Sequence, residues 1–271
     1  MSLSNDPEPR EQPRAKTRGL AAIFKPGRLA FIPYVMAGDP DIETTRAILT
    51  ALAENGADAI ELGIPYGDPL ADGPAIAAAG ARALTNGVNL TDVLSLAQET
   101  HAKVPPIILF TYYNPVYQFG LAEFARAAAD AGAAGVIVPD VTLEEAEPLR
   151  LALGAHHIEM PLVVAPTTPP ERAARIAEQS GGFVYVVSRL GVTGTGEAPN
   201  LEPLRKQIAA LRSVTKKPLA VGFGISTRAQ VDAVRALVDG VIVGSALIDA
   251  YSGTRREEAA SRVAKYVTSL L

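Results

Sequence analysis

The chain has 271 residues, of which 48% are hydrophobic and 20% are charged, and its formal net charge is −4. These proportions are typical of a folded globular protein, and the negative charge argues against nucleic-acid binding. The sequence contains no cysteine, which excludes disulfides, thiolate metal sites and a cysteine nucleophile. No apolar run approaches the roughly 18 residues of a membrane span. We therefore expect a cytoplasmic protein that binds neither membrane nor nucleic acid.

The first residues differ in composition from the rest of the chain. Residues 1–16 are polar, hold three prolines and lack the apolar core of a signal peptide. We predict a disordered leader over 1–16 and one domain over 17–271, with an extra helix near the start of the domain.

Short apolar runs recur along the whole domain. They are continuous in Val, Ile, Leu and Ala, as is typical of strands buried on both faces of a parallel sheet. The predicted strands are Ala30–Met36, Ala59–Gly63, Ile107–Thr111, Gly135–Pro139, Met160–Ala165, Phe183–Val187, Leu219–Phe223 and Val241–Gly244.

The segments between these runs carry helical periodicity, as in Leu121–Ala131 and Arg228–Val238. Eight strands, each followed by a helix, predict a single (β/α)8 TIM barrel. An open doubly wound sheet is the alternative, but it needs a dinucleotide fingerprint or an edge strand, and the sequence shows neither. The long connection after the second strand predicts an extra helix over Pro74–Leu84, before the regular helix at Leu90–Lys103.

Active sites of this fold lie at the carboxyl ends of the strands, and that rule sorts the polar residues. Those at the predicted strand ends are Asp39, Glu61, Asp68, Asp72, Tyr112, Asn114, Asp140, Thr167, Ser188, Arg189, Thr193 and Ser245. His101, His156 and His157 map to the opposite face, and no lysine lies in or just after a predicted strand. A metal site and a Schiff-base mechanism are therefore disfavoured.

Two carboxylates stand out. Glu61 lies inside the apolar strand Ala59–Gly63, where it is either a general acid/base whose pKa burial raises or a structural glutamate paired with arginine. Asp72 stands two residues before Pro74, where it can cap the helix that begins there, face a ligand, or do both.

Glycines follow the last two strands, in Gly222-Phe223-Gly224 and Gly244-Ser245. Barrels of this type often bind phosphate there, because glycine lets the backbone approach the anion. Two ordinary tight turns are the alternative. The glycine-rich segment Ser188–Asn200 matches neither the dinucleotide fingerprint nor a P-loop, and we interpret it as a mobile lid beside the phosphate.

These motifs together resemble the α subunit of tryptophan synthase. The most specific run is Glu61-Leu62-Gly63-Ile64-Pro65-Tyr66-Gly67-Asp68-Pro69-Leu70-Ala71-Asp72-Gly73-Pro74. Supporting runs occur in family order over roughly residues 20 to 270, and they are Phe31-Ile32-Pro33-Tyr34, Gly38-Asp39-Pro40, Tyr112-Tyr113-Asn114-Pro115, Ser188-Arg189-Leu190-Gly191-Val192-Thr193-Gly194, Gly222-Phe223-Gly224-Ile225 and Gly244-Ser245-Ala246.

The resemblance implies retro-aldol cleavage of indole-3-glycerol phosphate to indole and glyceraldehyde 3-phosphate. It implies that Glu61 is the general acid/base and that Asp72 stabilises positive charge on the ring N–H. The substrate-binding residues that it implies are Tyr34, Phe110, Tyr112, Tyr185, Thr193, Gly194, Phe223, Gly224, Gly244 and Ser245. No metal is implied.

The resemblance also implies a partner, the tryptophan synthase β subunit, in an α2β2 heterotetramer. Pyridoxal phosphate is expected in that subunit and no cofactor in this chain. The implied interface residues are Pro65, Asp68 and Asn114. The chain departs from the family pattern at Gly67, where serine is common, and at Thr142, where proline is frequent.

Two other functions remain open at this stage. A related phosphate-binding barrel could act on another indole- or ribose-phosphate intermediate, although ring-forming synthases of that kind rely on a lysine that the strand ends lack. The other hypothesis is a catalytically silent barrel that only binds a partner, and the presence of both Glu61 and Asp72 argues against it.

Overall fold

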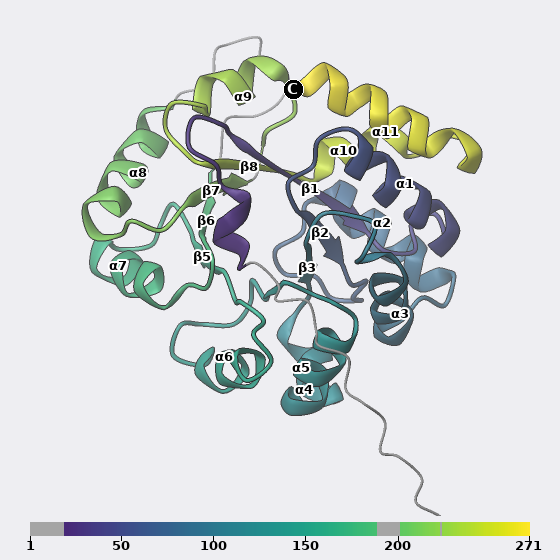
Figure 1. The fold of residues 1–271 in the computed structure, drawn as a ribbon, viewed down its shortest axis with the longest axis horizontal. Coiled ribbons are helices and arrows are strands. Elements are labelled where there is room, and N and C mark those ends of the chain that lie inside the picture. The colour runs from purple at the N-terminus through teal and green to yellow at the C-terminus, as the bar shows by residue number, and fades with distance from the viewer. Residues whose placement is uncertain (1–18, 189–200, 223) are drawn as a thin grey trace, which may run out of the picture.

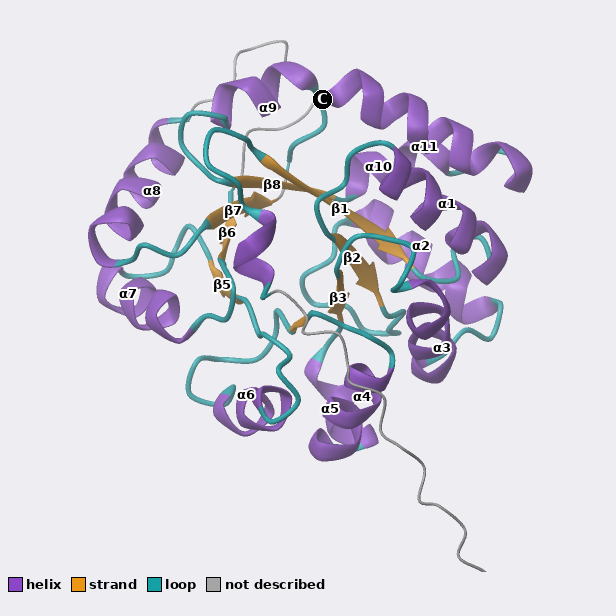
Figure 2. Ribbon diagram, in the orientation of Figure 1, coloured by secondary structure: helices purple, strands orange, loops and turns teal. Residues whose placement is uncertain are grey.

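The computed structural model describes residues 19–188, 201–222 and 224–271. Eight parallel strands lie at its centre and helices surround them (Figures 1 and 2). The strands are β1 Ala30–Met36, β2 Ile60–Gly63, β3 Ile107–Phe110, β4 Gly135–Ile137, β5 Leu162–Val164, β6 Val184–Val187, β7 Leu219–Gly222 and β8 Gly240–Val243. The predicted (β/α)8 barrel is confirmed.

The sheet order is β4-β3-β2-β1-β8-β7-β6-β5, so that β4 and β5 are its two ends. A single bridge between Gly135 and Glu159 joins these ends. The Val136 N–H donates to the Glu159 carbonyl at 2.9 Å, and the Glu159 N–H donates to the Ala134 carbonyl at 3.2 Å. The barrel therefore closes through a short contact rather than a full strand ladder.

The helices follow the strands in the order that the sequence predicts. They are α1 Ile42–Glu54, α2 Pro74–Thr85, α3 Leu90–Thr100, α4 Tyr113–Phe119, α5 Leu121–Asp130, α6 Glu147–Gly154, α7 Pro170–Gln179, α8 Glu202–Val214, α9 Arg228–Val234, α10 Ser245–Tyr251 and α11 Arg256–Leu270. Helix α2 occupies the long connection between β2 and α3. Helix α9 is shorter than its periodicity predicts, since it ends at Val234 instead of Val238.

A short 3-10 helix, η1 (Leu20–Ile23), lies across one end of the barrel (Figure 1). Leu20 is fully buried there. The Glu159 carboxylate accepts a hydrogen bond from the Leu20 N–H and so fixes η1 to the segment before β5. This is the amino end of the strands, which leaves the carboxyl end open for a site.

The core comes from both faces of the strands. All seven residues of β1 are buried, as are all four of β2, β3, β7 and β8. An ionisable side chain within these strands therefore needs a neutralising partner, a shifted pKa or a functional role, because burying an unpaired charge costs folding free energy. Glu61 in β2 is such a residue.

Candidate active site

A cavity of about 380 Å3 opens at the carboxyl ends of the strands. Its walls come from β1, β2, β3, β6 and β8, from the loop after β7, and from α2 and α10. The lining residues are Tyr34, Glu61, Asp72, Ile76, Phe110, Tyr185, Gly224, Ile225, Ser226, Ile242, Gly244, Ser245, Ala246 and Asp249. Both carboxylates singled out in the sequence thus reach one cavity.

Glu61 projects into this cavity from β2, where it stands level with Tyr34 of β1. Its side chain is 1% exposed, and its Oε1 has no hydrogen-bond partner among the described residues. No arginine of the described chain forms an ion pair with it, so the structural alternative of an arginine-paired glutamate finds no support. Burial raises the pKa of Glu61 to about 8, so that the carboxyl is largely protonated at neutral pH.

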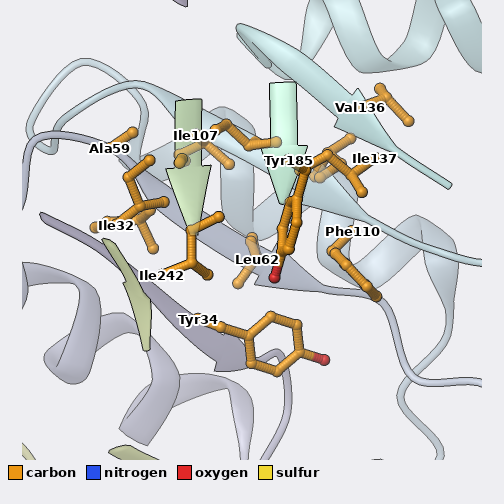
Figure 3. Close-up of a cluster of buried hydrophobic side chains, with 14 of the residues drawn as sticks. Ile32, Tyr34, Ala59, Leu62, Ile107, Phe110, Val136, Ile137, Tyr185 and Ile242 are labelled. Carbon is orange, nitrogen blue, oxygen red and sulfur yellow. The ribbon is translucent and has the colours of Figure 1, made fainter. Parts of the chain in front are cut away.

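Aromatic rings stand beside Glu61. Tyr34 and Phe110 pack edge to face with ring centroids 5.5 Å apart, and Tyr185 approaches from β6 (Figure 3). Burial raises the pKa of Tyr34 and of Tyr185 well above the ordinary value, and the charge of Glu61 adds to the shift, so both phenols stay neutral. The wall is apolar and aromatic, which suits an aromatic ring.

Two glycines make room for these tyrosines. A Cβ atom at Gly63 would lie 2.1 Å from the Tyr34 hydroxyl, and one at Gly222 would lie 2.5 Å from the Tyr185 hydroxyl. Any larger residue at either position would therefore displace a ring of the cavity wall. This role of Gly63 could not be predicted from sequence, because the contact joins two different strands.

Asp72 is half-buried at the edge of the cavity. The Tyr112 hydroxyl donates a hydrogen bond of 2.8 Å to its Oδ1 and accepts one of 3.1 Å from the Ala71 N–H. Burial raises the pKa of Asp72, and the hydrogen bond from Tyr112 partly offsets that rise. Asp72 does not cap α2, since Gly73 occupies the N-cap position and no side chain bonds the helix end. The capping alternative is wrong.

Glycine backbone forms another part of the cavity lining, called the glycine-lined end below. Gly224 has φ +84°, a conformation that favours glycine, and Gly244 and Ser245 follow β8 and line the same cavity. This end lies close to the Asp72 segment, because a Cβ at Gly73 would be 3.8 Å from the Ser245 Oγ. The cavity thus has an aromatic end, an acidic edge and a glycine-lined end.

Of the residues expected at the site, one is placed differently and others lie outside the part of the chain that the structure describes. Tyr112 is absent from the lining and contacts Asp72 instead. Thr193, Gly194, Phe223 and Arg189 lie outside the described residues, as does the segment expected to form a lid, apart from Ser188.

The residues expected to contact the partner differ in their exposure to solvent. Asp68 and Asn114 are exposed, whereas Pro65 is buried. The Asn114 side-chain amide donates to the Tyr66 hydroxyl at 3.3 Å. Two large apolar side chains are exposed nearby in sequence, Leu70 at 78% and Tyr117 at 64%. Sequence reasoning missed both, because exposure cannot be read from residue type.

The cavity also contains residues that the sequence did not indicate. Ile76 comes from α2, Ile225 and Ser226 follow β7, and Asp249 lies one helical turn beyond Ser245 in α10. The three histidines lie outside the lining, with His101 at the end of α3 and His156 and His157 before β5.

Comparison with known proteins decides the family. The family model described as tryptophan synthase alpha chain matches residues 20–270. The chain belongs to this family. A tryptophan synthase alpha chain of Arabidopsis thaliana is 44% identical over 263 residues, covering 95% of each chain. One of Prochlorococcus marinus is 51% identical over 224 residues, covering 82% of this chain and 81% of the relative.

Solved structures agree with the family assignment. A chain of tryptophan synthase from M. tuberculosis, in an aminoacrylate-bound form, is 35% identical and superposes with a TM-score of 0.83, covering 93% of this chain and 97% of that one. A chain of the tryptophan synthase complex from Pyrococcus furiosus is 34% identical, with a TM-score of 0.81 and coverage of 89% and 97%.

Family membership carries the reaction expected from the sequence. The chain is a carbon–carbon lyase of tryptophan biosynthesis, and the reaction of its family is cleavage of indole-3-glycerol phosphate to indole and glyceraldehyde 3-phosphate. No helix among residues 19–188, 201–222 and 224–271 is long and apolar enough to span a bilayer.

Proposed function

We propose that Glu61 is the general acid/base of this lyase reaction and that Asp72 stabilises the positive charge on the indole ring. The observation that carries the proposal is the buried Glu61 carboxyl, which points into the cavity with Oε1 unpartnered among the described residues. A carboxyl with a raised pKa and no competing partner is suited both to give and to take a proton near neutral pH.

The proton transfers follow from this placement. Protonated Glu61 gives its proton to the ring carbon that bears the side chain, and the ring nitrogen becomes cationic. Asp72 stabilises that cation through the ring N–H. Glu61, now ionised, takes the proton of the adjacent side-chain hydroxyl. The carbon–carbon bond breaks, its electron pair returns to the ring, and indole and an aldehyde form.

The two ends of the cavity fit the two ends of the substrate. The walls formed by Tyr34, Phe110 and Tyr185 suit the indole ring. We assign the phosphate to the glycine-lined end, where Gly224, Gly244 and Ser245 present backbone and a hydroxyl. The roles expected for Thr193, Gly194 and Phe223 remain predictions.

The partner of this chain is the tryptophan synthase β subunit, which holds the pyridoxal phosphate of the complex. We propose that the docking surface includes Asp68 and Asn114 together with the exposed apolar Leu70 and Tyr117. Exposed apolar side chains together with a charge are typical of an interface. Leu70 is two residues from Asp72, which lines the cavity, so a partner docked here would stand close to the route by which indole leaves. Pro65 is buried and is left out of the proposed surface.

We also place the reaction in the cytoplasm, because the substrate is a charged phosphate ester that does not cross a membrane unaided. Fractionation of the source cells with an antibody to the chain tests this placement.

Release of indole from indole-3-glycerol phosphate tests the assignment of Glu61. Glu61→Gln is expected to lower the rate by roughly 100-fold or more, since one general acid/base contributes that much. The matched control is Glu159→Gln, at the other end of the barrel, which keeps an oxygen to accept from the Leu20 N–H. A Glu61→Gln rate above about a tenth of wild type refutes the assignment.

A further inference from the structure

Asp39 is a buried carboxylate that the proposed chemistry does not use. It follows β1 at the carboxyl end of the barrel, is 1% exposed and is absent from the cavity lining. Arg82 holds it with two parallel hydrogen bonds, from Nε to Oδ1 at 2.7 Å and from Nη2 to Oδ2 at 2.8 Å. The Tyr251 hydroxyl adds a third, to Oδ2 at 3.1 Å. Both carboxylate oxygens are thereby bonded.

The partners of Asp39 lie on two helices that supply the cavity. Arg82 belongs to α2, which begins two residues after Asp72. Tyr251 is the last residue of α10, whose first residue is Ser245. Arg82 Nη2 also donates to the Ser252 hydroxyl at 3.2 Å, just beyond α10. One carboxylate therefore ties α2 to α10 near the C-terminal ends of both helices.

The same two helices also meet at the cavity. They pack against each other, and a Cβ at Gly244 would lie 3.4 Å from the Ile76 side chain of α2. Asp72 stands just before α2 and Ser245 begins α10, so the pairing of these two helices lies between two residues of the cavity lining.

We infer that Asp39 is a positioning residue that, through Arg82 and Tyr251, sets the distance between the Asp72 edge of the cavity and its phosphate end. This inference rests on the proposed function, which assigns the two ends of one substrate to these places. The bidentate geometry suits the role, because a fork of two parallel hydrogen bonds fixes orientation as well as distance. Burial and the charge of Asp39 raise the pKa of Tyr251, which keeps its hydroxyl protonated as the donor.

A ligand that spans both ends of the cavity separates positioning from general stability. Indole-3-propanol phosphate has the ring and the phosphate of the substrate but lacks the hydroxyl groups needed for cleavage. Glycerol 3-phosphate occupies the phosphate end alone. If Asp39 sets the spacing, its loss weakens binding of the spanning ligand and leaves binding of the fragment nearly unchanged.

The test is calorimetric binding of both ligands to the full chain and to Asp39→Asn and Tyr251→Phe. We expect the Kd of indole-3-propanol phosphate to rise about tenfold in both variants and the Kd of glycerol 3-phosphate to change less than about twofold. Tyr251→Phe removes one oxygen and keeps the ring, so it serves where Asp39→Asn does not fold. The KM of indole-3-glycerol phosphate is expected to rise in parallel.

The matched control is Asp58→Asn. Asp58 has a side chain 7% exposed and is held by the Arg28 guanidinium at 2.9 and 3.1 Å, but it lies before β2, at the amino end of the barrel. Asp58→Asn should leave the Kd values of both ligands unchanged. Equal weakening of both ligands by Tyr251→Phe, or no weakening of either, overturns the inference. Failure of the wild-type chain to bind the spanning ligand instead overturns the proposed site.

Discussion

Glu61→Gln should do more than remove activity, because it should also stabilise the fold in a way that depends on pH. A buried carboxyl resists ionisation, whereas the same group in the unfolded chain ionises freely. Glutamine is close in shape and does not ionise. At a pH where Glu61 is ionised in the unfolded chain but protonated in the folded one, wild type loses free energy of unfolding. The substitution removes that loss.

The size of this effect follows from the raised pKa. The ordinary pKa is 4.5 and the folded value is about 8. Below pH 4.5 the carboxyl is protonated in both states and costs nothing. Between these values unfolding releases a proton, so the wild-type stability falls as the pH rises. One pKa unit corresponds to about 1.4 kcal/mol, and the loss between pH 5 and pH 8 is about 3 kcal/mol.

Urea denaturation of both proteins at pH 5 and pH 8 measures the effect. The free energy of unfolding of Glu61→Gln minus that of wild type should grow by about 3 kcal/mol over this range. The constant cost of burying an unpartnered amide cancels in that comparison. A difference that stays the same at the two pH values would refute the reasoning, since it would mean that Glu61 ionises alike in folded and unfolded chains.

Four further predictions concern the site and its partner. Steady-state indole release should have a bell-shaped pH profile, falling above about pH 8 as Glu61 loses its proton and falling in acid as Asp72, whose pKa burial raises, gains one; a profile without the alkaline limb contradicts the role of Glu61. Asp72→Asn should lower the rate by roughly tenfold or more without loss of thermal stability, and an unchanged rate would remove Asp72 from the chemistry. Gly63→Ala would place a methyl group 2.1 Å from the Tyr34 hydroxyl and should weaken binding of indole-3-propanol phosphate, measured by calorimetry. Adding Tyr34→Phe should restore part of that binding. Binding of Gly63→Ala as tight as wild type would show that the Tyr34 ring does not need this space. Asp68→Ala should weaken association with the β subunit in sedimentation experiments and reduce partner-stimulated indole release, and equal association would remove Asp68 from the interface.

The strand centres could be predicted because burial on both faces requires continuous apolar runs. Their ends could not, because a strand ends where its neighbour stops pairing. The strand predicted over Gly135–Pro139 ends at Ile137, and the one predicted over Met160–Ala165 spans only Leu162–Val164. These two lie at the ends of the sheet, where pairing is most limited.

Helix α4 was not predicted, for a related reason. It has seven residues, too few to show a helical period, and it includes Pro115. Its start is fixed from a distance, since the Asp140 carboxylate accepts from the Tyr113 N–H at 2.9 Å. Asp140 was noted as a polar residue at a strand end, and its hydrogen bond to α4 is visible only in three dimensions.

Local spacing identified two carboxylates that line one cavity, Glu61 and Asp72, but not all of their contacts. Asp72 stands where a helix cap is expected, yet its hydrogen-bond partner is Tyr112, 40 positions along the chain. Glu61 was identifiable because a carboxylate inside an apolar strand is costly to bury, so that its presence indicates a function or a partner. Ser226 and Asp249 carry no such signal, since exposed polar residues after strands and within helices are common.

The closure of the barrel at Gly135 and Glu159 has a consequence for how the fold opens. Each other pair of neighbouring strands shares a regular ladder, whereas β4 and β5 meet only at this bridge. The barrel is therefore most weakly paired at this bridge, and the amide hydrogens of Val136 and Glu159 should exchange with solvent sooner than those of β1 and β8. Glu159 forms the bridge with its backbone and holds η1 with its carboxylate. We therefore expect undocking of η1 to loosen the contact between β4 and β5, at the end of the barrel opposite the proposed chemistry.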